Sequence, residues 1–121
     1  MQQIQIPPLA EGEIHLCSLW LPNQGMTHTI LLLGDRDPAT WQEQMAWAKS
    51  IGGDLLSRAE LVIAYETQRS QFQAEAYWSN TEDDDPEYSG WAWCQNFYGS
   101  QLGCRQSNWL RARAVRRVVI Y

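Results

Sequence analysis

The sequence lacks the features of several large protein classes. No apolar run approaches the roughly 18 residues of a membrane span, and residues 1–12 hold no basic or apolar region of a signal peptide. Only three cysteines are present, Cys17, Cys94 and Cys104, with no metal-binding spacing. These absences predict a protein outside membranes, whose cysteines indicate a reducing compartment or plain packing roles and no disulfide framework.

Residue constellations that carry catalysis are also missing. Histidine occurs only as His15 and His28, and neither lies at a recognisable spacing from a nucleophile. The two rings approach each other if their segments pair, but two histidines without a third ligand make a weak zinc site. No glycine-rich phosphate loop is present. We therefore expect no enzymatic activity, no metal ion and no cofactor.

The composition that remains is that of one globular domain rich in tryptophan. Its 121 residues are 45% hydrophobic, and seven Trp and five Tyr stand beside two Phe, which suits half-buried positions and binding surfaces. Residues 1–87 carry all fourteen acidic residues and four basic ones, whereas residues 88–121 carry five arginines and no acid. An acidic body with a basic tail argues against nucleic acid as the partner.

Local patterns predict two helices between two groups of strands. The expected elements are strands 13–21 and 26–33 in a hairpin, helices over about 38–51 and 58–69, strands at 77–79, 91–98 and 111–120, and a turn or short strand at 99–103. The first helix has two possible starts, Asp37–Pro38 and the capping box of Thr40, and the second follows the capping box of Ser57. This order predicts an α+β domain on an antiparallel sheet, in which the first and last strands are able to pair.

Four segments of the chain resemble one known domain family. They are GGDLLSRAE (52–60), YWSNTE (77–82), AWCQNF (92–97) and RARAVRR (111–117). The resemblance is to the domain found at the C-terminus of bacterial collagen-like adhesins and in small phage and prophage proteins. It is more distantly similar to the C-type-lectin-like variable domains of diversity-generating retroelements. The resemblance covers about residues 40–120, with Leu56 where the family usually has Pro and Asn80 where it has a small residue.

The resemblance implies a C-type-lectin-like fold over residues 13–121, after an extended arm over residues 1–12, and a binding role in place of an enzymatic one. One hypothesis is a phage- or prophage-encoded binding module, adhesin-like, that recognises a protein or glycan partner. The alternative is a small intracellular inhibitor, made by a phage, of a host defence protein. The reduced-looking cysteines and the absent signal peptide favour the inhibitor, which is expected in the host cytoplasm. The adhesin resemblance favours the module, which is expected on a virion. Both are compatible with a homo-oligomer.

Residues 95–109 form the predicted interaction surface. This stretch mixes Tyr, Trp, Asn, Ser and Arg with few aliphatic residues, a composition typical of evolved binding surfaces. The resemblance points to the same stretch, which contacts the ligand in the variable retroelement domains. The predicted binding residues are Gln95, Asn96, Tyr98, Gln101, Arg105, Gln106, Asn108 and Trp109.

A second set of residues is predicted to be structural. It consists of Ser57, Glu60, Trp78, Glu82, Trp93, Arg116 and Arg117. Because alternate residues of a strand face opposite sides, the C-terminal arginines do not form one patch, and Arg116 and Arg117 face opposite ways. Several are expected to pair with Glu60, Glu82 or the acidic loop 82–87. That loop is interpreted as solvated, with calcium binding as the alternative.

Overall fold

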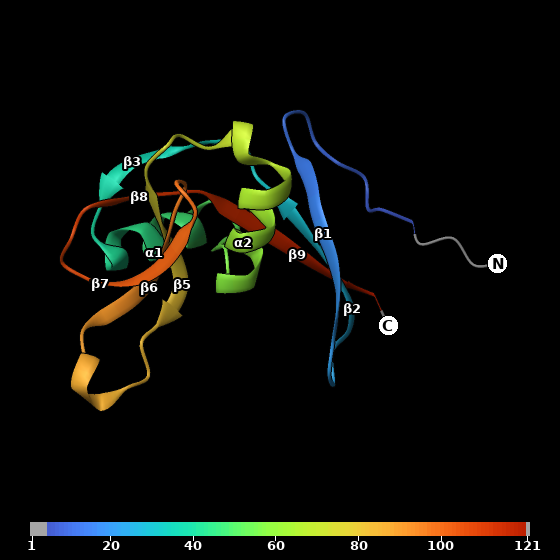
Figure 1. The fold of residues 1–121 in the computed structure, drawn as a ribbon. Coiled ribbons are helices and arrows are strands. Elements are labelled where there is room, and N and C mark those ends of the chain that lie inside the picture. The colour runs from blue at the N-terminus through green and yellow to red at the C-terminus, as the bar shows by residue number, and fades with distance from the viewer. Residues whose placement is uncertain (1–4, 121) are drawn as a thin grey trace.

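A computed structural model describes residues 5–120 (Figure 1). The elements are β1 (Ile14–Leu21), β2 (Gly25–Leu31), β3 (Arg36–Ala39), α1 (Trp41–Ser50), β4 (Asp54–Leu55), α2 (Arg58–Thr67), β5 (Ala76–Glu82), β6 (Trp91–Asn96), β7 (Ser100–Arg105), β8 (Leu110–Ala112) and β9 (Ala114–Ile120), with 3-10 turns η1 (Arg69–Gln71) and η2 (Pro86–Tyr88). None of the helices in this described range is long and apolar enough to cross a membrane. Of the predicted arm, residues 5–12 form no helix or strand, and residues 1–4 lie outside the described part.

The strands form two sheets, which confirms the α+β class. One sheet has the order β1-β2-β9-β4 and is antiparallel throughout, and the other has the order β3-β8-β5-β6-β7. The second sheet is mixed, because β5 and β8 run parallel. Figure 1 shows α2 between the β1-β2-β9 side of the molecule and the β5-β6-β7 side.

The predicted hairpin is confirmed, but two predictions about the last strand are wrong. The segment predicted as one strand over 111–120 is divided at Arg113, so that β8 lies in one sheet and β9 in the other. The buried guanidinium of Arg113 donates to the carbonyls of Gln71 in η1 and of Leu32 just after β2, at 2.6 and 2.8 Å, and so ties the break to both segments. The first and last strands do not pair, because β2 lies between them and pairs with both.

Side-chain caps determine where both helices begin. Thr40 caps α1 by accepting a hydrogen bond from the backbone N–H of Glu43. The start at Asp37–Pro38 is wrong, because residues 36–39 form β3 instead. The capping box of α2 is confirmed: the Glu60 N–H donates to Ser57 Oγ at 3.2 Å, and the Ser57 N–H donates to Glu60 Oε1 at 2.8 Å.

Two buried clusters fill the space between the elements. The first lies around α2 and includes the stacked rings of Phe72 and Phe97, whose centroids are 4.3 Å apart. The second lies between α1 and the β5-β6-β8 part of the mixed sheet, around the fully buried Trp78. The Trp78 indole N–H donates to the Ala39 carbonyl at 3.1 Å, so this large side chain is buried without an unsatisfied donor.

Candidate binding face

The β6–β7 ribbon separates the core from a partly exposed face. Ala92 and Cys94 of β6 are fully buried in the cluster around α1. Because side chains alternate along a strand, Trp91 and Trp93 point to the opposite side, where both remain partly exposed. An alternating strand over 91–98 predicts Trp91, Trp93 and Phe97 on one face and Ala92, Cys94 and Asn96 on the other. The structure shows that the tryptophan side is the outer one, whereas Phe97 lies beyond the end of β6 and is buried.

Cross-strand register sets the neighbours of each tryptophan on this outer face. Trp91 lies opposite Arg105 and Trp93 lies opposite Gly103. The Arg105 guanidinium carbon is 5.3 Å from the Trp91 ring centroid. At the second tryptophan, the guanidinium carbon of Arg58 from α2 lies 3.8 Å from the Trp93 ring centroid. Each indole therefore carries one arginine of the chain itself, at a distance typical of cation–π contacts.

Gln101, one of the predicted binding residues, holds Arg58 in place. Its Oε1 accepts from Arg58 Nε at 3.0 Å, and its Nε2 donates to the Arg58 carbonyl at 2.6 Å. This two-way contact joins β7 to the start of α2. Gln101 thus fixes one border of the outer face through Arg58, a residue that the sequence analysis did not select.

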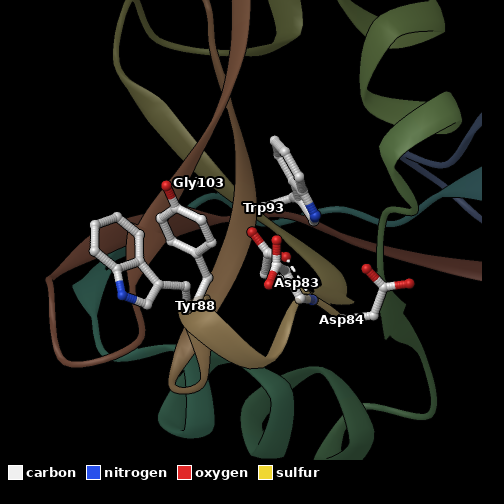
Figure 2. A pocket seen from close by; sticks show the side chains of 7 residues that line it. Asp83, Asp84, Tyr88, Trp93 and Gly103 are labelled. Carbon is white, nitrogen blue, oxygen red and sulfur yellow. Dashed lines mark hydrogen bonds between the residues drawn. The ribbon is translucent and has the colours of Figure 1, made fainter.

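A hollow of about 470 Å³ opens on this face beside the loop between β5 and β6 (Figure 2). It is lined by Asp83, Asp84, Asp85, Tyr88, Trp91, Trp93 and Gly103. Its volume falls within the roughly 300–1,000 Å³ of small-ligand sites. The lining combines aromatic rings with carboxylates and contains no basic residue.

Gly103 keeps the hollow open. A Cβ at this position would lie 3.7 Å from Cε3 of Trp91 and 3.8 Å from Oδ2 of Asp83. These are ordinary contact distances, so alanine fits, but any longer side chain projects into the space between the ring and the carboxylate. The missing side chain thus gives the hollow its depth.

The acidic loop is shaped by its own carboxylates. Asp83 Oδ1 accepts from the Asp85 N–H and Asp85 Oδ1 accepts from the Glu87 N–H, both at 3.0 Å. The resulting turn places Tyr88 edge-on against Trp91, with ring centroids 5.5 Å apart. In the view of Figure 2 the Asp83 side chain lies between those of Tyr88 and Trp93. Loop folding uses one oxygen of each of these aspartates, and the second forms no hydrogen bond within residues 5–120.

The C-terminal arginines do not neutralise this loop, contrary to expectation. Arg117 pairs with Glu60 as predicted and also with Asp54, but Arg116 pairs with Glu13 of the segment before β1. Arg111 pairs with Asp35, Asp37 and Glu75. Six of the fourteen acidic residues take part in these ion pairs, which leaves eight without one among residues 5–120. Five of these eight, including Glu82, lie in the loop 82–87.

Two of the predicted binding residues are buried and offer almost no surface. Gln95 is 2% exposed, and its Nε2 donates to the carbonyls of Asn96 and Ser100. Gln106 is 8% exposed, and its Nε2 donates to the Trp91 carbonyl at 3.1 Å. Their amides satisfy backbone groups of the ribbon, so we assign them a structural role in place of ligand contact.

The other predicted residues lie at opposite ends of β7. Asn96 and the exposed Tyr98 are at the turn before this strand, whereas Asn108 and the exposed Trp109 follow it. A strand of this length spans about 17 Å, so these side chains do not meet. Arg105 and Gln106 do border a second hollow of about 430 Å³, which shares Trp91 with the first.

Two other clusters lie outside the hollow. His15 Nε2 and His28 Nδ1 are 3.3 Å apart, with Ser18 Oγ within 3.0 Å of both nitrogens. Residues 5–120 bring no three His, Cys, Asp or Glu side chains into a metal-binding group. The sulfurs of Cys94 and Cys104 are 3.2 Å apart as free thiols, so these two cysteines are neighbours, which their sequence spacing did not indicate.

No protein-family model and no curated protein matches this chain. The resemblance of the four segments to the adhesin domain family therefore stays a prediction.

Proposed function

We propose that this chain is a C-type-lectin-like binding module, phage- or prophage-encoded, that holds a protein or glycan partner on the outer face of its β6–β7 ribbon. The fold is compatible with this proposal, since two helices pack against two sheets and the four resembling segments lie at β4–α2, β5, β6 and β8–β9. The segment 95–109 contributes Gln101, Gly103 and Arg105 to the face.

The observation that carries the proposal is the hollow over Trp91, Trp93 and Gly103. Aromatic rings that stay partly exposed provide flat apolar contact area, and such residues dominate the energetics of binding surfaces. The carboxylates beside these rings belong to a loop that two of them help to fold, since Asp83 and Asp85 accept hydrogen bonds from loop N–H groups. This arrangement supports recognition of a partner by the rings and the remaining carboxylate oxygens.

The test is binding to arrays of glycans and of surface-displayed peptides with three variants. Gly103→Leu fills the hollow from a strand position with ordinary contact distances, and Trp93→Leu removes one wall. Trp109→Leu is the matched control, because it removes an equally large aromatic side chain that is 69% exposed and outside the hollow.

We expect array signals of the wild-type protein to be lost in the first two variants and kept in the control. Circular dichroism melting of each variant is the control that tests whether its fold is retained. Signals that survive Gly103→Leu and disappear with Trp109→Leu would overturn the placement of the binding face.

A further inference from the structure

The charge of the hollow identifies the chemistry of its ligand. We infer that it takes a cationic side chain, arginine or lysine, carried by a basic segment of a protein partner. This inference rests on the proposed binding function and narrows its ligand class. It starts from three carboxylates, those of Asp83, Asp84 and Asp85, that face one cavity without a basic residue in its lining.

No ion pair among residues 5–120 balances the negative charge of the loop 82–87. Arg111, Arg116 and Arg117 are engaged with acids in β4, in α2, at β3 and just before β1, β3 and β5, and none of their ion pairs reaches the loop 82–87. A concave wall of like charges raises the local concentration of counter-ions and steers ligands of opposite charge. Arg58 and Arg105 lie on the Trp93 and Trp91 rings, but neither forms an ion pair with the loop among residues 5–120. A ligand cation would provide the pairing that these arginines do not.

Aromatic rings at the same place suit an organic cation. The Arg58 and Arg105 contacts show that indoles of this face accept guanidinium groups, at 3.8 and 5.3 Å from the ring centroids. Tyr88 is 45% exposed and carries no arginine among the cation–π contacts of residues 5–120. Its ring is therefore open to a ligand cation next to the Asp83 carboxylate.

Two other ligand classes fit the hollow less well. A bare metal ion needs several ligands that converge on one point, and no such group of acidic side chains forms in residues 5–120. Anionic partners, such as sulfated glycans or nucleic acids, are repelled by the loop. A neutral glycan stacks on exposed indoles, but it leaves three carboxylates without a counter-charge.

The experiment uses two blocked peptides that differ only in charge. One is the acetylated and amidated sequence Gly-Arg-Gly-Arg-Gly, and the other has citrulline, the uncharged near-isostere, in place of arginine. Binding to the whole chain is followed by titration calorimetry and by the NMR shifts of the tryptophan indole N–H groups. We expect the arginine peptide to bind at least about fivefold more tightly, the factor that corresponds to one cation–π contact.

Charge-matched variants separate the hollow from the net charge. The triple variant Asp83→Asn, Asp84→Asn and Asp85→Asn keeps the oxygens that turn the loop and removes three negative charges. The control variant Glu11→Gln, Glu43→Gln and Glu66→Gln removes the same charge from exposed sites elsewhere. We expect only the loop variant to lose the arginine peptide, and Tyr88→Leu to weaken its binding.

The outcomes distinguish this inference from the proposed function. Equal binding of the two peptides, or equal loss in both triple variants, would overturn the cationic ligand. So would a neutral oligosaccharide that shifts the indole N–H groups while the arginine peptide does not, although the face would remain a binding site. If neither probe shifts these groups and Gly103→Leu changes no array signal, the proposed function itself fails.

Discussion

Replacing Arg117 by methionine should strongly destabilise the fold, because it leaves a buried carboxylate without its counter-charge. Arg117 lies in the central strand β9, and its Nε and Nη2 donate to the two oxygens of Glu60 at 2.9 and 2.6 Å. The Glu60 side chain is only 3% exposed. It also accepts from the Thr29 hydroxyl at 2.7 Å and from the Ser57 N–H at 2.8 Å.

The size of the effect follows from what remains after the substitution. Breaking a buried ion pair by removing one partner costs about 3–5 kcal/mol. Two of the hydrogen bonds to Glu60 survive in Arg117→Met, and the Arg117 side chain is 27% exposed, so we expect the lower end, about 3 kcal/mol. At about 4 °C per kcal/mol for a domain of this length, Tm falls by about 12 °C.

Dependence on pH provides a second readout with a defined sign. Burial raises the pKa of the Glu60 carboxyl, but the hydrogen bonds and the charge of Arg117 outweigh it, so the folded-state pKa lies below the usual value. The ion pair therefore stabilises the fold above the unfolded-state pKa of about 4.3 and loses its effect as the pH falls. Without Arg117, burial is expected to raise this pKa. The difference in unfolding free energy between the wild-type protein and Arg117→Met should therefore become smaller from pH 7 toward pH 4.

Urea denaturation at pH 4, 5.5 and 7 measures this difference in unfolding free energy. The double variant Arg117→Met with Glu60→Gln removes both charges, and a glutamine still completes the capping box, so it should recover most of the loss. Arg105→Met, on the exposed face, is the control and should change stability by less than about 0.5 kcal/mol. A loss of unfolding free energy below about 1 kcal/mol at pH 7, or a loss that does not change with pH, would refute the reasoning.

Three further predictions concern the helix cap and the two side-chain clusters. Ser57→Ala removes the side-chain acceptor of the α2 cap and should cost about 1 kcal/mol by urea denaturation; Ser57→Thr should cost less, and equal losses would contradict the cap. Oxidised glutathione should convert Cys94 and Cys104 into a disulfide with release of two reduced glutathiones, since their sulfurs are 3.2 Å apart. Mass spectrometry should find one remaining free thiol, at Cys17, and three would contradict the prediction. Burial and the neighbouring His28 lower the pKa of His15, so stability should fall as the pH drops below about 6.5; His15→Gln should flatten this decline between pH 7 and 5, and an unchanged slope would exclude the pair as its cause.

Local patterns predicted the elements whose pairing is local. The hairpin of β1 and β2 and the capped start of α2 follow from turn residues and from Ser57, because the atoms that form these contacts are within a few residues of one another. The break at Arg113 was missed because an alternating pattern continues through it. The groups that hold the side chain inside are the carbonyls of Leu32 and Gln71 and the ring of Phe72, which the sequence does not place near Arg113.

The candidate face was predicted in part, for a similar reason. The alternation of Trp91 and Trp93 was visible, but the interpretation of the neighbouring acids as a solvated loop separated them from the face they border. Gln95 was predicted to bind because it belongs to the polar, aromatic-rich segment 95–109. Its burial depends on carbonyls supplied by the turn that follows β6, and no residue pattern indicates that geometry.

The distribution of ion pairs separates the charges that hold the fold from those available for binding. Arg111, Arg116 and Arg117 take their carboxylates from segments before β6 and connect distant parts of the chain. The loop 82–87 has five acids outside these pairs, and their mutual repulsion opposes the compact state. The proposed cationic ligand would offset this repulsion beside Tyr88 and Trp91, where no ion pair among residues 5–120 does so.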